Sequence, residues 1–131
     1  ALPDRLKTQI LFTSFEISRN SNRMGIQLEV LLPNQLEQLL TSPVYPGTVQ
    51  LTPAGKLIVL MRDAQVTGGY PRIFQLTDES INIISQKSFG EKVKFSIIFQ
   101  NQNQFLYLHL RIFNTKYQIF FPTLCYNKVY V

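Results

Sequence analysis

Two strand-like runs joined by a proline-glycine turn constrain the fold of this chain more than any other feature. Thr48–Thr52 alternates between apolar and polar residues, whereas Leu57–Met61 is apolar at every position. Between them, Thr52-Pro53-Ala54-Gly55 places proline second and glycine fourth, which is typical of a type I turn. We therefore predict a β-hairpin over residues 48–62 that closes at Pro53–Gly55, with Leu57–Met61 buried on both faces.

A polar loop follows the second strand of this hairpin. Residues 63–72 place a carboxylate, an amide, a hydroxyl, a phenol and a guanidinium around Gly68 and Gly69. Adjacent glycines permit positive φ and allow another backbone or a ligand to come close. Pro71 then restricts the exit of the loop. A capped β-turn and a binding site both fit these ten residues, and the variety of donors and acceptors favours a site.

The rest of the chain predicts mainly strands, so we expect a mostly-β domain with one or two short helices, for which a barrel is one arrangement. Apolar periodicity indicates a helix over about 3–12 and a turn or two of helix over 34–40. Asp78 is expected to cap a short helix, with Ile81 and Ile84 facing inward. The further predicted strands are 15–18, 24–30, 73–77, 93–99, 105–113 and 116–121, with polar turns at 19–23, 89–92 and 100–104.

Composition indicates one domain, 1–131, with a core and a partly covered surface. The chain is 45% hydrophobic and only 16% charged, which is low for a surface that is free on all sides. The formal net charge is +5, and the excess of basic residues lies mainly after Ile84. No basic run or aromatic RNA-binding pattern accompanies this excess. We therefore do not expect nucleic-acid binding. The first residue is alanine rather than methionine, as in a piece of a longer protein.

The chain has one histidine, His109, and one cysteine, Cys125. They cannot form a metal-ligand cluster or an internal disulfide, and we expect both to be structural. No Walker loop, G-x-G-x-x-G motif, signal peptide or apolar run of membrane length is present. We therefore expect no metal, no cofactor bound by this chain alone, no membrane association and a cytoplasmic location.

Two features of the sequence could bind a small carboxylate substrate. The Thr67-Gly68-Gly69 turn can point backbone N–H groups at an anion. Arg23 and Arg72 can each grip a carboxylate in a bidentate manner. Asp63 and Tyr70 are the candidates for proton transfer, and we treat both as catalytic candidates.

Four ordered motifs carry a resemblance to a known family. They are Ser21–Glu29, Pro46–Leu51, Pro53–Gly55 and Asp63–Pro71. In order and spacing they resemble the family of the 5-oxoprolinase C-subunit, also known as the biotin-dependent carboxyltransferase type, allophanate hydrolase subunit 2 and the antagonist of a sporulation-kinase inhibitor. The resemblance covers about residues 15–95.

This resemblance implies a cyclophilin-like β-barrel and a larger subunit with two related halves, of which this chain is similar to the carboxy-terminal one. It implies an enzyme that opens 5-oxoproline to glutamate with ATP. The implied partners are a B-type subunit that is related to the kinase inhibitor and a large A-type subunit, which together would supply the ATP site. In the related urea carboxylase and allophanate type, the corresponding module is a carboxyltransferase that uses biotin.

We expect the substrate site where strand ends from distant parts of the sequence converge at the mouth of such a barrel. Arg23 and Thr67 should meet there, and Arg23→Ala should weaken carboxylate binding more than Lys56→Ala. The expected substrate-binding residues are Arg23, Gln50, Gln65, Thr67, Gly68, Gly69 and Arg72.

The sequence departs from the family pattern at several positions. Val30 stands where the family has glycine, Gln27 replaces an arginine, Val66 replaces a threonine of the central loop, and Leu57 replaces a proline. The segment 105–131 is aromatic and apolar where the family continues into a polar helix. These changes bear on whether this copy is active.

Two alternatives to an oxoprolinase subunit stay open. One is a biotin-dependent carboxyltransferase module that needs a separate biotin carrier, and the other is a non-catalytic antagonist that binds a kinase inhibitor. In each case we expect the isolated chain to fold but to be inactive. We also expect exposed apolar patches, or self-association that hides them, around Phe105, Phe113, Phe120 and Phe121.

Overall fold

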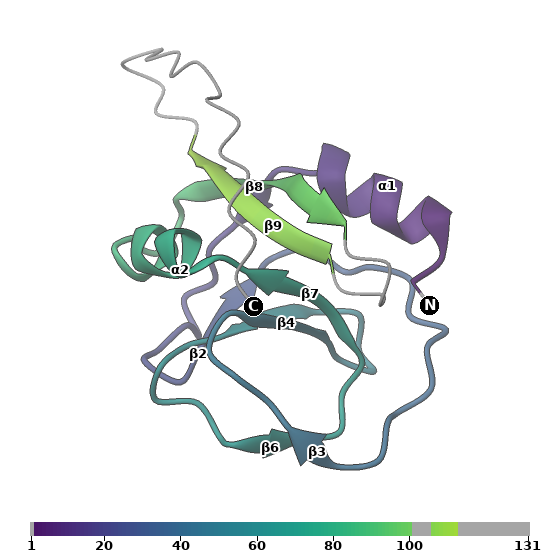
Figure 1. Ribbon diagram of the computed structural model, residues 1–131. Coiled ribbons are helices and arrows are strands. Elements are labelled where there is room, and N and C mark those ends of the chain that lie inside the picture. The colour runs from purple at the N-terminus through teal and green to yellow at the C-terminus, as the bar shows by residue number, and fades with distance from the viewer. Residues whose placement is uncertain (1, 101–105, 113–131) are drawn as a thin grey trace.

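A computed structural model describes residues 2–100 and 106–112 of the chain (Figure 1). The helices in these ranges are α1 (Asp4–Phe12) and α2 (Asp78–Ser85). The strands, in chain order, are β1 (Phe15–Glu16), β2 (Gly25–Leu28), β3 (Ser42–Pro43), β4 (Thr48–Leu51), β5 (Leu57–Leu60), β6 (Thr67–Gly68), β7 (Arg72–Leu76), β8 (Lys92–Gln100) and β9 (Leu106–Ile112).

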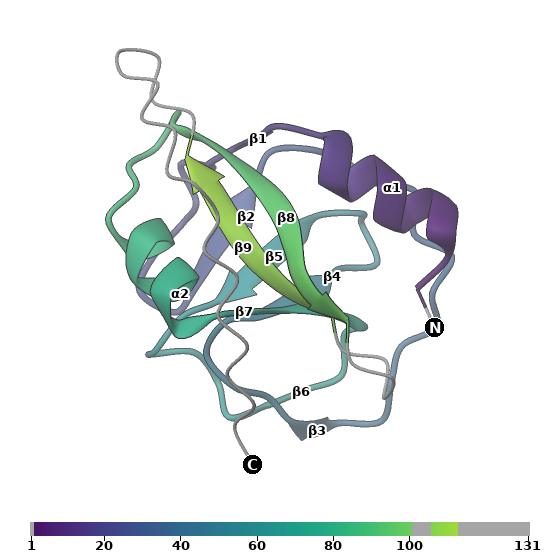
Figure 2. The ribbon, with the colours of Figure 1, turned by 45° about the horizontal axis from the view of Figure 1, so that its top comes forward.

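Seven of these strands form one sheet in the order β1-β8-β9-β7-β4-β5-β2. Strands β7 and β9 run parallel, and the other neighbours are antiparallel. Strands β3 and β6 form a separate antiparallel ribbon, which lies away from α1 and β8 in both views (Figures 1 and 2). The prediction of a mostly-β fold with short helices is confirmed.

The two edge strands of the seven-stranded sheet approach each other just beyond β1. Ile17 forms an isolated bridge with Leu28. On either side, the N–H of Ser18 donates to the carbonyl of Gln27 and the N–H of Glu29 donates to that of Glu16, each at 2.9 Å. The sheet therefore curls until its edges touch, but its described strands do not form a closed barrel. The cyclophilin-like barrel stays a prediction.

The predicted hairpin is present as β4 and β5. Leu51 pairs with Leu57, and the turn is closed by the N–H of Gly55, which donates to the carbonyl of Thr52 (2.9 Å). Gly55 has a φ of 82°, and a Cβ there would lie 2.2 Å from the carbonyl oxygen of Leu32, so only glycine fits this turn. Burial on both faces is confirmed except at Ile58, which is half-buried.

Both helices form where the periodicity predicts them. Leu6 and Ile10 of α1 are buried, and Ile81 and Ile84 of α2 are buried as expected. The predicted cap of α2 is wrong by one residue. The N-cap is Thr77, whose hydroxyl oxygen accepts a hydrogen bond from the N–H of Ser80 at 3.2 Å, and Asp78 and Glu79 are in the first turn, where the helix dipole favours acidic groups.

The predicted helical turns over residues 34–40 are wrong, because these residues have no helical structure. The side chain of Asn34 accepts from the N–H of Leu36 (2.9 Å) and donates to the carbonyl of Thr52 (2.7 Å). The N–H of Leu39 donates to the carbonyl of Gly69 at 2.8 Å. Partners that are distant in sequence thus replace the local hydrogen bonds of a helix.

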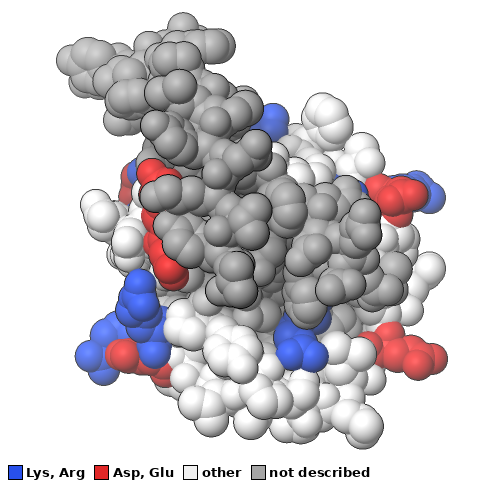
Figure 3. Space-filling model, in the orientation of Figure 1, with Lys and Arg blue, Asp and Glu red and all other residues white. Residues whose placement is uncertain are grey.

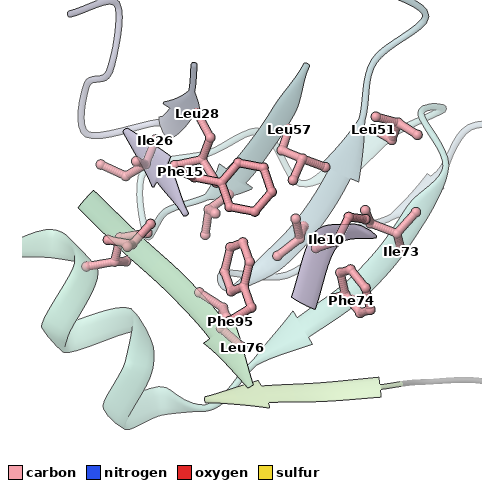
Figure 4. Packing of buried hydrophobic residues seen from close by; sticks show 14 of the residues in the cluster. Ile10, Phe15, Ile26, Leu28, Leu51, Leu57, Ile73, Phe74, Leu76 and Phe95 are labelled. Carbon is pink, nitrogen blue, oxygen red and sulfur yellow. The ribbon is translucent and has the colours of Figure 1, made fainter. Parts of the chain in front are cut away.

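The core lies inside the curled sheet (Figure 4), and α1 contributes Leu6 and Ile10 to it. The rings of Phe15 and Phe95 pack with their centroids 5.6 Å apart, and Ile10 of α1 is fully buried near Phe74. Burial of each such side chain stabilises the fold by about 1.5–3 kcal/mol. This packing holds β4, β5 and β7, whose ends carry the candidate site.

The C-terminal predictions are tested only in part. Gly90 has a φ of 83°, which agrees with the expected turn before β8, and β8 begins one residue earlier than predicted. Strand β9 confirms a strand within 105–113, and His109 pairs there with Ser96. The predicted strand 116–121, most of the break at 100–104, and Cys125 lie outside the described residues.

Candidate functional site

The loop between β5 and β7 divides the predicted site residues into two groups. The first part of this loop turns just after Met61, where the N–H of Ala64 donates to the Met61 carbonyl (3.1 Å). The second part forms β6 and so belongs to the β3–β6 ribbon. Arg23 and Asp63 lie at the first part. The ribbon, the loop residues that flank it and the strands β4 and β7 carry Gln50, Gln65, Thr67, Gly68, Gly69, Tyr70 and Arg72.

The ribbon is a short ladder. Ser42 of β3 lies opposite Gly68 of β6, and beyond this pairing the N–H of Val44 donates to the carbonyl of Val66 at 2.9 Å. The loop that the sequence places at a strand end is therefore itself part of a second, small sheet. The substitution of valine for threonine at position 66 leaves this backbone hydrogen bond in place.

Gly68 and Gly69 allow neighbouring groups to approach the backbone closely, and neither glycine has a positive φ. Positive φ is found instead at Gly47, Gly55 and Gly90. A Cβ on Gly68 would lie 2.9 Å from Nε2 of Gln50, and one on Gly69 would lie 3.0 Å from the carbonyl oxygen of Leu39. The expected approach of another backbone is confirmed at Gly69, whereas the conformational freedom of the glycine pair is not used.

Two buried polar atoms beside Gly68 have no hydrogen-bond partner among the described residues. They are Nε2 of Gln50 and Oγ of Ser42, a residue that is itself half-buried. Gln50 is 1% exposed in the middle of β4, and β6 covers its amide at Gly68. An unsatisfied buried donor costs about 1–3 kcal/mol, so native proteins seldom keep one without a ligand, a water molecule or a strained role.

The other ribbon residues surround this buried pair. Nη1 of Arg72 donates to the carbonyl of Pro43 (2.9 Å), which ties the start of β7 to β3. Nε2 of Gln65 would lie 3.8 Å from a Cβ on Gly68, so the amides of Gln50 and Gln65 both approach that glycine. Thr67 and Tyr70 are exposed. The ribbon thus brings together most of the predicted substrate-binding residues.

Arg23 belongs to a different group. Its Nε lies 3.4 Å from Oδ2 of Asp63, and the side chains are 92% and 53% exposed, respectively. Both line a pocket to which no residue of the ribbon contributes. The structure therefore joins Arg23 to Asp63 at this pocket, which Thr67 does not line, and the expected convergence of Arg23 with Thr67 stays a prediction.

This pocket, which we call the basic pocket, has a volume of about 480 Å3. It lies between the β1–β2 loop, the end of β5 and the end of α2, and its lining carries four basic side chains and one acidic one. Lining residues are Ile17, Ser18, Arg19, Ser21, Asn22, Arg23, Ile26, Met61, Arg62, Asp63, Ile81, Asn82, Ser85, Lys87 and Phe89.

The charges at one side of the basic pocket are partly paired. Nζ of Lys87 lies 3.1 Å from Oε1 of Glu91. The N–H of Ser88, which donates to the carboxylate of Glu91, and the ammonium of Lys87 hold the pKa of Glu91 below its ordinary value of 4.5. The guanidinium carbon of Arg19 lies 4.6 Å from the centroid of the Phe89 ring, a cation–π contact.

Most of the basic pocket has no signal in the sequence. Arg19 and Arg23 lie in the polar turn predicted at 19–23, but Arg62 and Lys87 belong to no motif. They reach the pocket because β5 and α2 end beside the same loop. Ser42, whose Oγ is buried, is likewise absent from the predicted site, since a serine before Pro43 carries no pattern of its own.

Metal sites and membrane spans are both absent from the part of the chain that the structure describes. Residues 2–100 and 106–112 contain no group of three or more His, Cys, Asp and Glu side chains that could hold a metal ion. The same residues contain no helix with the length and apolar character needed to cross a membrane.

A comparison with protein families identifies the chain. Residues 2–97 match the model of the carboxyltransferase domain, subdomain A and B. The chain belongs to this carboxyltransferase-domain family. The match begins earlier than the region over which the motifs suggested a resemblance, because it includes α1.

Two curated relatives carry the same name. The chain is 37% identical over 84 residues to the 5-oxoprolinase C-subunit of Haemophilus influenzae, and this alignment covers 63% of the chain and 27% of the relative. It is 39% identical over 83 residues to the 5-oxoprolinase C-subunit of Escherichia coli, covering 62% of the chain and 27% of the relative. The chain therefore spans about a quarter of the length of the relatives that it matches.

Proposed function

We propose that this chain is part of a 5-oxoprolinase subunit that works with partner subunits to open 5-oxoproline to glutamate, driven by ATP. The names of the two relatives support this assignment. The observation that carries the site is the buried, unpartnered pair of Gln50 and Ser42 beside Gly68. In this proposal the partners, a B-type subunit and a large A-type subunit, supply the ATP site, since the sequence contains no phosphate-binding loop.

The chemistry of a cyclic amide suits this pair. The lactam of 5-oxoproline presents a carbonyl acceptor and an N–H donor on adjacent atoms. Nε2 of Gln50 is a free donor for the carbonyl, and Oγ of Ser42 can accept from the N–H. Gln65 and Thr67, with the backbone of Gly68 and Gly69, complete the surroundings of the ring.

The group that would bind the substrate carboxylate and the group that would transfer a proton also lie beside the ribbon. Arg72 already reaches the ribbon, where its remaining N–H donors can bind the substrate carboxylate. Tyr70 lies two residues after the end of β6 and is the better-placed candidate for proton transfer. Asp63 is paired with Arg23 at the basic pocket, so its predicted catalytic role requires a substrate that extends to that pocket.

Access to Gln50 requires the ribbon to move. The amide is 1% exposed, and β6 lies directly over it at Gly68. The ribbon has only two residues in each strand, so its displacement breaks few hydrogen bonds. In this proposal the ribbon opens to admit the substrate and closes over it, which holds the lactam against Gln50 while the ring is hydrolysed.

The test is the rate of 5-oxoproline-dependent ATP hydrolysis by the assembled subunits. Gln50→Leu should lower this rate at least about tenfold, because it removes the donor to the lactam carbonyl. Gln35→Leu, at an exposed glutamine, is the matched control and should leave the rate unchanged. Equal rates for the two variants would contradict the site. Turnover by this chain without its partners would contradict the proposal that the partner subunits supply the ATP site. Light scattering of the purified chain measures whether it associates with itself.

A biotin-dependent carboxyltransferase is the second candidate, because the matching family is named for carboxyl transfer. Residues 1–131 contain no biotin-carrier Met-Lys-Met motif, so biotin would have to arrive on a carrier outside these residues. In that case the Gln50 and Ser42 pair would bind the ureido group of biotin or the amide acceptor. Carboxyl transfer from a biotinylated carrier, without any 5-oxoproline-dependent ATP hydrolysis, would favour this candidate over the first.

A further inference from the structure

We infer that the basic pocket is a second binding site, which takes a small organic anion with an apolar body and one oxyanion head group, either a carboxylate or a phosphate. The pocket shares no residue with the ribbon. The inference does not rest on the proposed function, because an anion can bind here whichever reaction the assembly performs.

The rim of the basic pocket carries an excess of positive charge. Arg19, Arg23, Arg62 and Lys87 come from three separate segments, and Asp63 is the acidic residue in the lining. Figure 3 shows basic side chains gathered at the lower left, on the side where the β1–β2 loop lies in Figure 1. Cations held together in this way attract an anion and raise its local concentration.

Part of this charge is available to a ligand. Asp63 pairs with Arg23, and Glu91 pairs with Lys87. Arg62 has neither a hydrogen bond nor an ion pair to another described residue, and Arg19 contacts the Phe89 ring through the face of its guanidinium. Two guanidinium groups therefore keep their forked donors for a carboxylate or a phosphate, which they can bind in a bidentate manner.

The floor of the basic pocket selects the rest of the ligand. Ile17, Ile26, Met61 and Ile81 are buried beneath the rim, and the ring of Phe89 forms part of the wall. The volume of about 480 Å3 lies within the range of small-molecule sites and is far larger than a bare phosphate ion needs. An apolar body on the floor with its oxyanion at the arginines uses both surfaces.

The experiment measures binding of defined probes to the full chain by calorimetry and by amide chemical shifts. Phenyl phosphate and benzoate carry the two head groups, benzamide is the neutral analogue, and inorganic phosphate lacks the apolar body. We expect phenyl phosphate or benzoate to bind more tightly than benzamide and than inorganic phosphate, with shifts confined to residues 17–26, 61–63 and 81–89. The order of the two anions identifies the preferred head group. Affinity should fall as salt is added.

The decisive variant is Arg62→Ala, with Arg5→Ala on α1 as the matched control of equal charge change. Arg62→Ala should weaken binding about tenfold, whereas Arg5→Ala should change it less than about twofold. Arg62→Lys should weaken binding to an intermediate extent, because lysine keeps the positive charge but lacks the forked N–H donors of the guanidinium. Equal effects of Arg62→Ala and Arg5→Ala, shifts elsewhere, equal binding of benzamide, or no saturable binding of either aromatic anion would each overturn the inference.

Discussion

The ribbon and the basic pocket are reached by one loop, yet they are built by opposite means. At the ribbon, backbone lies against backbone and against a buried amide, with no room for a Cβ at Gly68 or Gly69. At the basic pocket, long side chains such as Arg23 stand in solvent around an apolar floor. The ribbon should therefore respond to added volume, and the pocket should respond to changes of charge.

The ribbon and the basic pocket also differ in how apolar and how charged their exposed side chains are. Large apolar side chains are exposed around the ribbon, among them Leu40, Tyr45 and Val66, and the bottom of Figure 3 is mostly white. The lining of the basic pocket, in contrast, carries five charged side chains. Exposed apolar groups of this kind are typical of surfaces that another protein covers. The apolar patch predicted around Phe105, Phe113, Phe120 and Phe121 lies outside the described residues.

The largest effect on stability should come from adding volume at the ribbon. Gly68→Val places a branched side chain against the buried amide of Gln50, which cannot move into solvent, and should destabilise the fold by about 1–3 kcal/mol. Arg62→Val at the exposed rim of the pocket should change stability by less than about 0.5 kcal/mol. Urea denaturation of both variants measures this difference. Equal denaturation midpoints for the two variants would contradict the expectation that the ribbon tolerates added volume less well than the basic pocket.

The next effect has the opposite sign. Gln50→Leu keeps a similar volume and removes the unpartnered Nε2, so it should stabilise the resting chain by roughly 1 kcal/mol while it impairs catalysis. Gln35→Leu on the surface should leave stability within about 0.5 kcal/mol of the starting protein. A loss of stability in Gln50→Leu would mean that the amide is satisfied in the native protein and that it has a structural role.

Local patterns predicted the parts of the fold that local interactions decide. The hairpin follows from the turn chemistry of Pro53 and Gly55 and from the apolar run beside it, and α1 follows from the spacing of Leu6 and Ile10. The cap of α2 was missed by one residue because Thr77 and Asp78 are both good N-caps, and only the threonine hydroxyl reaches an N–H of the first turn.

Errors arose where distant segments decide the structure. The helix expected over 34–40 is replaced by hydrogen bonds to Thr52 and Gly69, which no local pattern reveals. The motifs named nearly all of the ribbon residues, but they could not show that Arg23 pairs with Asp63. That pairing depends on where β2 and β5 end relative to each other, a property of the strand register.

A smaller contrast concerns the two arginines of the predicted site. Arg72→Ala removes the hydrogen bond to Pro43 that joins β7 to the ribbon, and it should cost about 1 kcal/mol. Arg23→Ala removes an exposed ion pair and should cost less than about 0.5 kcal/mol. Denaturation midpoints rank them, and a double-mutant cycle of Arg23→Ala with Asp63→Ala isolates the pair. A larger cost for Arg23 would show that the basic pocket also supports the fold.

The smallest effect should appear in the dependence of stability on pH. The N–H of Ser88 and the ammonium of Lys87 lower the pKa of Glu91 in the folded chain, so the ionised carboxylate is favoured by folding. This contribution is present above the ordinary pKa of 4.5 and is lost as the pH falls through the lower, folded value. Glu91→Gln should therefore flatten the loss of stability below about pH 4.5.

The ribbon provides the control for this measurement. Gln50→Leu changes a side chain that is uncharged at every pH, so its stability curve should be displaced but keep the shape of the original. Lys87→Met removes the ammonium and leaves the N–H of Ser88, which is the largest single cause of the shift, so it should retain part of the acid dependence that Glu91→Gln loses. Urea midpoints measured from pH 7 downward decide the matter. An unchanged dependence of stability on acid pH in Glu91→Gln would mean that Ser88 and Lys87 do not hold the Glu91 carboxylate in solution. The ammonium of Lys87 would then be less fully paired than the structure indicates, and more of its charge would be available at the basic pocket.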